Sequence, residues 1–143
     1  MSKPESKQWT AADIPSQAGK RVIITGANSG IGYHAALKLA RKGAHVILAC
    51  RDRQRGEAAL TRLNADTPGA DVELALLDLA SLASVRDFAA NELVQRRPLH
   101  LLINNAGVMA PPHRLETADG FELQFGTNVL GHFALTGLLL PAL

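Results

Sequence analysis

The 143-residue sequence has little cysteine, few aromatic residues and no marked excess of charge of either sign. Its single cysteine, Cys50, has no second thiol with which to form an internal disulfide or a paired metal site. The formal net charge is only +2 and aromatic residues make up 4% of the chain, so nothing indicates a nucleic-acid partner. Disulfide-stabilised folds and nucleic-acid binding are therefore disfavoured, and a single cysteine suits a reducing compartment.

Long hydrophobic runs are also missing. No stretch approaches the roughly 20 apolar residues that a membrane-spanning helix requires. The first eight residues are polar and lack the apolar centre of a secretory signal. We therefore expect a cytoplasmic protein without a transmembrane segment.

An alternation of short apolar runs with amphipathic segments fills most of the chain. Residues 1–20 are expected to form an N-terminal extension whose only bulky apolar side chains are Trp9 and Ile14. From residue 21 onward the pattern predicts an α/β domain, with a parallel sheet covered by helices on both faces. The strands are expected at 22–25, 44–50, 72–77 and 99–103, and the helices at 30–42, 53–64, 81–97 and 120–143.

The most informative segment is 25–32, Thr-Gly-Ala-Asn-Ser-Gly-Ile-Gly, between the first strand and the first helix. Glycines allow a tight turn and a close approach of backbone to ligand, and a helix N-terminus attracts phosphate. A nucleoside-triphosphate P-loop is excluded because no Gly-Lys-Ser/Thr follows. A purely structural turn and a methyltransferase loop both remain open from the glycine spacing alone.

Two charged residues follow the second and third strands. Arg51 stands where a cofactor that lacks a 2′-phosphate usually meets an acidic side chain. A guanidinium can bind a phosphate through two hydrogen bonds, so Arg51 favours NADP and disfavours NAD and a methyltransferase cofactor. Asp78 could accept a hydrogen bond from an adenine amino group, or it could instead cap the following helix.

Amide side chains mark the remainder of the expected site. Asn104-Asn105-Ala106-Gly107 follows the fourth strand, at the sheet edge where open α/β sheets bind ligands, although an ordinary turn would look the same. Asn128 lies among apolar residues of the last helix and is either a satisfied core amide or an active-site group. The five histidines have no metal-ligand spacing and are interpreted as surface or core residues.

In this order and at these separations, the glycine segment, Asp78-Leu79, residues 104–107 and Asn128 resemble the short-chain dehydrogenase/reductase superfamily, in its compact form. The residues around 49–52, 102–109 and 128–133 resemble its retinol-dehydrogenase-like and WW-domain-oxidoreductase-like branch. The resemblance implies a Rossmann-type, doubly wound parallel sheet with strand order 3-2-1-4. Residues 21–143 would then be the N-terminal part of an NAD(P)-binding domain.

The resemblance also assigns roles to individual residues. Asn128 would be the catalytic asparagine, which supports a water-linked proton relay. Arg51 would hold the 2′-phosphate with help from Ser29 or Asn28, and Asp78 and Leu79 would flank the adenine. The full set implied to bind the cofactor is Gly26, Asn28, Ser29, Gly30, Ile31, Gly32, Arg51, Asp78, Leu79, Asn105, Ala106 and Gly107.

The family's catalytic serine and Tyr-x-x-x-Lys have no counterpart among these 143 residues. The only tyrosine, Tyr33, stands beside the glycine segment with Leu37 four positions later, so it cannot serve as that acid–base group. We therefore expect an NADP-dependent carbonyl/alcohol oxidoreductase by family, with little turnover by this chain alone. The alternative is a non-catalytic dinucleotide-binding half-domain or a truncated remnant. Exposed apolar surface on the last helix and an open strand edge are expected to favour self-association.

Overall fold

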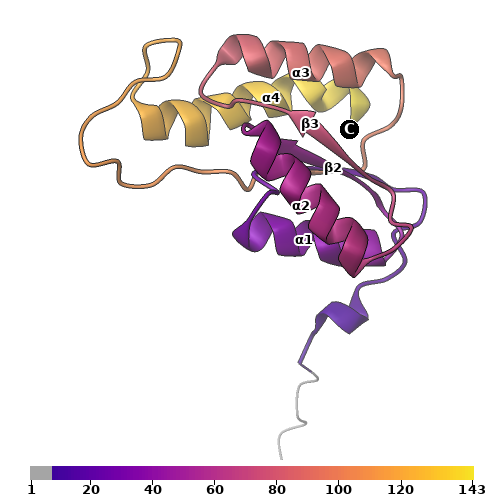
Figure 1. Ribbon diagram of the computed structural model, residues 1–143. Coiled ribbons are helices and arrows are strands. Elements are labelled where there is room, and N and C mark those ends of the chain that lie inside the picture. The colour runs from indigo at the N-terminus through magenta and orange to yellow at the C-terminus, as the bar shows by residue number, and fades with distance from the viewer. Residues whose placement is uncertain (1–7) are drawn as a thin grey trace, which may run out of the picture.

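The computed structural model describes residues 8–143, in which four parallel strands form a sheet between two layers of helices (Figure 1). The sheet order is β3-β2-β1-β4, which confirms the expected 3-2-1-4 topology. The strands are β1 (Arg21–Thr25), β2 (His45–Cys50), β3 (Val72–Leu76) and β4 (Leu101–Ile103). The principal helices are α1 (Gly30–Arg41), α2 (Arg53–Asp66), α3 (Leu82–Val94) and α4 (His132–Leu139).

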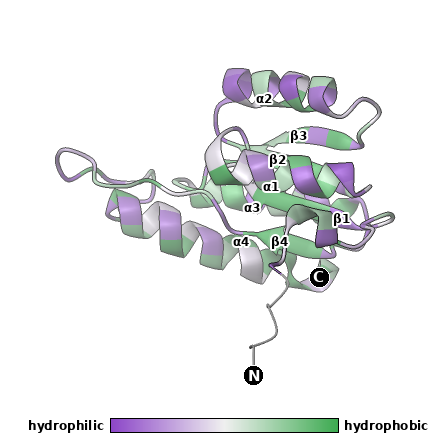
Figure 2. Cartoon of the chain, turned by 90° about the horizontal axis from the view of Figure 1, so that it is seen from below, coloured by the Kyte–Doolittle hydropathy of each residue, from purple (hydrophilic) through white to green (hydrophobic). Residues whose placement is uncertain are grey.

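The core is divided by the sheet into two clusters. Strand residues alternate between the faces, so Val22 and Ile24 join α1 and α2 while Ile23 joins α3 and α4. Both central strands are buried along almost their whole length. This explains why they read as continuous apolar runs, and Figure 2 shows them as the hydrophobic centre of the molecule.

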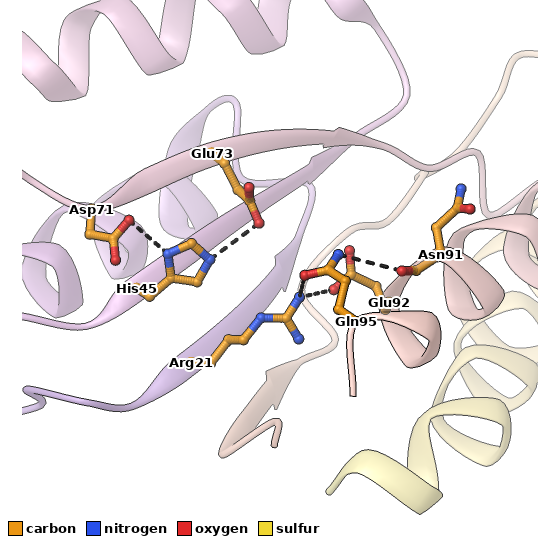
Figure 3. Close-up of polar contacts among 7 residues, drawn as sticks. All are labelled: Arg21, His45, Asp71, Glu73, Asn91, Glu92 and Gln95. Carbon is orange, nitrogen blue, oxygen red and sulfur yellow. Dashed lines mark hydrogen bonds and ion pairs between the residues drawn. The ribbon is translucent and has the colours of Figure 1, made fainter. Parts of the chain in front are cut away.

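A buried ion pair closes the amino edge of the sheet. The Arg21 guanidinium, at the start of β1, contacts the carboxylate of Glu92 on α3 and also donates to Gln95 Oε1 at 3.3 Å (Figure 3). The side chains of Arg21 and Glu92 are only 4% and 7% exposed. This edge is opposite the one at which the motif residues gather, so the pair lies outside the site.

Residues 8–20 cross the surface of α1. They contain a short 3-10 helix, η1 (Ala11–Asp13), whose Ala12 carbonyl accepts a hydrogen bond at 3.0 Å from Nζ of Lys42, the residue that follows α1. Trp9 is 69% exposed, so most of this ring remains outside the packed interior. The expected extension covers 1–20, and residues 1–7 lie outside the described part.

The last helical segment differs from the prediction. An uninterrupted helix from residue 120 is wrong: helical structure begins at residue 123, where the Glu122 carboxylate accepts the N–H groups of Phe125 and Gln124 at 2.8 and 2.9 Å. These bonds lower the pKa of Glu122. Between them and α4 the chain forms a π-helix, η2 (Phe125–Gly131), and it ends in a 3-10 turn, η3 (Leu140–Ala142).

Smaller differences occur at two other predicted ends. The helix expected to reach residue 97 ends at Val94, because Arg96 adopts a left-handed φ of 49°. Leu99 does not join the fourth strand, since its N–H donates to the Ala142 carbonyl at 2.8 Å. Among the described residues, no helix is both long and apolar enough to span a membrane.

Candidate nucleotide-binding site

The glycine segment turns sharply between β1 and α1. Gly26 has a left-handed φ of 65°, and its N–H donates to the Ala49 carbonyl at 2.8 Å. A Cβ at Gly26 would lie 2.8 Å from Ala106 Cα, so only glycine lets the two loops meet. Ser29 precedes α1 without a side-chain capping bond, which leaves the first turn of the helix open to an anion.

The segment after β4 is tied to this turn through β1. Asn105 Nδ2 donates to the Thr25 carbonyl at 3.0 Å, and Thr25 Oγ1 accepts the N–H groups of Asn105 and Ala106 at 2.9 Å each. Gly32 lies directly against the Asn105 side chain, since a Cβ at Gly32 would clash with Asn105 Nδ2. The Asn105 amide therefore holds two loops together, which leaves the backbone of Ala106 and Gly107 to face a ligand.

Asn128 lies within the π-helix, opposite the same loop. Its Oδ1 accepts from the Val108 N–H, and its Nδ2 donates to the Val108 carbonyl, both at 2.9 Å. One backbone unit therefore holds both ends of the side-chain amide, which keeps one further N–H donor and one acceptor position, and the catalytic role implied by the family resemblance remains a prediction. A π-turn at a candidate functional residue is a common association, and nothing in the helix-like sequence pattern signalled it.

These loops enclose a cavity of about 140 Å³ at the carboxyl edge of the sheet. Thr127 lines it, and the buried Thr127 hydroxyl has no hydrogen-bond partner among residues 8–143. An unpaired buried hydroxyl is unfavourable unless a ligand supplies a partner. The cavity is lined by Gly26, Asn28, Ala49, Arg51, Leu77, Asp78, Leu79, Ala106, Gly107, Val108 and Thr127.

Seven of the predicted cofactor-binding residues thus share one cavity, and the other five do not line it. Ser29 lines an adjoining groove with Asn28, Arg55 and Arg62. Gly30 and Ile31 instead line a larger, mostly apolar hollow of about 650 Å³ on the outer side of α1, where Ile31 is 83% exposed. The structure therefore does not bring these two residues to the same cavity as Asp78.

The two charged candidates, Arg51 and Asp78, both line the cavity and follow the neighbouring strands β2 and β3. Asp78 Oδ1 accepts the Ala80 N–H at 2.9 Å, while Ser81, not Asp78, caps α3. The reading of Asp78 as a helix cap is therefore wrong, and its carboxylate lines the cavity. Arg51 is exposed at the end of β2, where its guanidinium can reach an anion at the cavity mouth.

Two titratable groups near the site have structural roles. Burial raises the pKa of the Cys50 thiol to about 11, although hydrogen bonds with the backbone of Ala27 and Asn28 partly oppose the shift. Tyr33 is buried on α1 and donates its hydroxyl to Asp66 at 3.1 Å, with the Arg62 guanidinium 3.7 Å above its ring. Neither side chain lines the cavity. Within residues 8–143 no cluster of three or more His, Cys, Asp or Glu side chains could hold a metal ion.

Comparison with known proteins identifies the class. The short chain dehydrogenase family model matches residues 20–143, so the chain belongs to the short-chain dehydrogenase family, whose members bind nicotinamide dinucleotides. The chain is 53% identical to human retinol dehydrogenase 13 over 94% of its own length and 41% of that protein. It is 47% identical to a short-chain dehydrogenase/reductase of Armillaria gallica, over 98% of this chain and 45% of that one.

Solved structures agree on the fold. A crystal structure of an uncharacterized protein from Mycobacterium paratuberculosis superposes with a TM-score of 0.81 at 54% identity, covering 94% of this chain and 46% of that one. The RhlG/NADP active-site complex of Pseudomonas aeruginosa superposes with a TM-score of 0.73 at 32% identity, covering 89% and 47%. The chain thus spans 41–47% of the length of these four proteins.

Proposed function

We propose that this chain forms the adenine-nucleotide side of an NADP site in a short-chain oxidoreductase that interconverts alcohols and carbonyl compounds. The observation that carries the proposal is the cavity at the carboxyl edge of the sheet. It joins the Gly26 turn, the Arg51 guanidinium and the Asp78 carboxylate. When bound, NADP would supply the nicotinamide ring that exchanges a hydride with the substrate carbon.

The polar groups of the cavity suit each part of the cofactor. The pyrophosphate would lie against the Gly26 turn and the uncapped start of α1. Asp78 would accept from the adenine amino group, and the unpaired Thr127 hydroxyl offers a further hydrogen bond. Ala106 and Gly107 would run beside the ribose toward the nicotinamide.

Charge favours the 2′-phosphorylated cofactor over NAD. Arg51 lines the cavity, and Arg55 and Arg62 border the adjoining groove beside Asn28 and Ser29. A 2′-phosphate near Asn28 would thus meet up to three guanidinium groups. Hydrogen bonds between ionised partners are the strong ones, worth about 1.5–3 kcal/mol each.

Titration of the chain with NADPH and with NADH, followed by nicotinamide fluorescence, tests the proposal. Arg51→Gln should weaken NADPH binding by about tenfold or more and leave NADH binding nearly unchanged, because only NADPH carries the 2′-phosphate. Arg53→Gln is the matched control, since Arg53 pairs with Glu57 at 3.6 Å on the surface of α2. Failure of both cofactors at millimolar concentration would refute the proposal, and tighter binding of NADH would refute the role of Arg51.

Catalysis by these 143 residues alone is a separate matter. They contain no Tyr-x-x-x-Lys, and Tyr33 is bonded to Asp66 away from the cavity. We expect cofactor binding without measurable alcohol oxidation, as in a dinucleotide-binding half-domain. Robust turnover by the isolated chain would contradict this expectation. We also propose a cytoplasmic location, which the composition of the chain favours.

A further inference from the structure

His132, at the start of α4, is buried and uses both of its ring nitrogens. Its Nδ1 lies 2.9 Å from the Asn128 carbonyl oxygen, and its Nε2 lies 2.8 Å from Thr25 Oγ1. A carbonyl oxygen can only accept, so Nδ1 must carry the proton. Nε2 of the neutral ring is then an acceptor and receives the Thr25 hydroxyl proton.

This tautomer completes the hydrogen bonding of Thr25. The hydroxyl has two acceptor positions, which take the N–H groups of Asn105 and Ala106 at 2.9 Å each. Its single proton could go to the Ile103 carbonyl at 3.4 Å or to His132 Nε2 at 2.8 Å, and the shorter contact prevails. One buried oxygen thereby links β1, the loop after β4 and α4.

The connected groups border the cavity from two sides. Ala106 lies on the loop wall, and Thr127 lies on the π-helix wall next to Asn128. The Asn128 side chain already fastens Val108, so His132 supplies a second, independent tie between the same two walls. We propose that His132 is a positioning residue, which sets the separation of these walls and hence the affinity for the cofactor. This inference rests on the proposed nucleotide-binding function.

A double-mutant cycle on the full 143-residue chain tests the link. His132→Leu and Thr25→Val should each weaken NADPH binding by about tenfold, and the double variant should lose little more than either single one. Thr25→Ser, which retains the hydroxyl, should bind normally. Equal additive losses, or no loss in His132→Leu, would overturn the proposal.

Two isosteric replacements separate the two hydrogen bonds of the ring. Asparagine places a donor near the Nδ1 position, and glutamine places an acceptor near the Nε2 position. If the hydrogen bond to Thr25 sets the separation of the walls, His132→Gln should bind NADPH more tightly than His132→Leu when Thr25 is present. The two variants should bind NADPH equally when each is combined with Thr25→Val. His132→Asn should restore less. Indistinguishable affinities for the leucine, asparagine and glutamine variants would show that packing alone matters.

A control distinguishes positioning from general stability. Leu135 is fully buried on α4 and does not line the cavity, so Leu135→Val should lower the melting temperature and leave NADPH affinity unchanged. Nitrogen-15 shifts of His132 should show a protonated Nδ1 and an unprotonated Nε2. A ring protonated at Nε2 instead would overturn the inference.

A readout without cofactor separates this inference from the proposed function. If the unmodified chain binds neither NADPH nor NADH, the function fails, but hydrogen exchange at the Ala106 amide still reports the loop position. His132→Leu leaves the Thr25 hydroxyl that accepts the Ala106 N–H in place, so faster exchange in this variant would support the link to Thr25. Unchanged exchange in His132→Leu would refute it.

Discussion

The close approach of the two cofactor loops allows a quantitative prediction for Gly26. Alanine at this position would have to adopt a φ of 65°, which disfavours an L-residue by about 1–2 kcal/mol. Its Cβ would also lie 2.8 Å from Ala106 Cα, a backbone atom that cannot rotate away. Such overpacking destabilises by about 1–3 kcal/mol. We therefore expect Gly26→Ala to lower the free energy of unfolding by about 2–5 kcal/mol.

Two other glycines provide matched controls that separate the two effects. Gly30 has a φ of 54° but open space around its Cβ position, so Gly30→Ala should lower the free energy of unfolding by only about 1–2 kcal/mol. At Gly107 a Cβ would meet Asn128 Oδ1 at an ordinary 3.5 Å, and φ is not left-handed. Gly107→Ala should be neutral or stabilise by up to about 1 kcal/mol through the unfolded chain.

Urea unfolding followed by far-ultraviolet circular dichroism gives the three free energies, and NADPH titration gives the affinities of the folded variants. Only Gly26→Ala should also weaken binding strongly, because it pushes Ala106 toward the ligand. Equal destabilisation by Gly26→Ala and Gly30→Ala would refute the close-approach argument. A loss at Gly107 as large as that at Gly26 would refute the assignment of the tight contact.

Three further predictions concern stability and association. Glu92→Ala should lower the free energy of unfolding by about 3–5 kcal/mol because it leaves the Arg21 guanidinium buried without its partner, whereas Arg21→Met combined with Glu92→Leu should recover most of the loss; a small effect of Glu92→Ala would contradict the buried pair. The folded chain retains the Cys50 proton up to about pH 11, while the unfolded chain releases it above about pH 9. The contribution of the protonated Cys50 thiol to the free energy of unfolding is thus complete below pH 9 and falls by about 2–3 kcal/mol toward pH 11. Cys50→Ala should remove this pH dependence from the free energy of unfolding measured in urea. Phe133 on α4 is 80% exposed, so if apolar surface drives self-association, Phe133→Glu should lower the mass measured by light scattering; a monomeric unmodified chain would contradict that prediction.

The fold could be predicted from the sequence because its determinants are local. Buried parallel strands appear in the sequence as continuous apolar runs, and the glycines of segment 25–32 indicate a turn at the start of a helix. The strand order followed from the resemblance, because no periodicity within Val22–Thr25 shows which strand lies beside it. The predicted ends of helices and strands were less accurate. The helix α3 ends before Arg96, whose φ is left-handed, and Leu99 lies outside β4 because its N–H donates to the distant Ala142 carbonyl.

The site was predicted as residue types but not as a set of contacts. Asn105 and Asn128 read as candidate ligand-binding amides, yet the structure engages both side chains with backbone groups of neighbouring loops. No local sequence pattern marks His132, so the sequence alone places it only among the surface or core residues. Its two partners stand 107 and 4 residues away in sequence, and only folding brings them to opposite sides of one ring.

The sequence alone determined the kind of binding motif: a strand, a glycine turn and a helix, with Arg51 and Asp78 at the ends of later strands. Backbone sterics and apolar periodicity act over a few residues, so they can be recognised from the sequence. The tertiary structure decided which of these groups share a cavity, how the π-helix carries Asn128, and why Gly26 has no room for a side chain. Those properties depend on contacts between segments 20 to 107 residues apart along the chain, and such contacts exist only after the chain has folded.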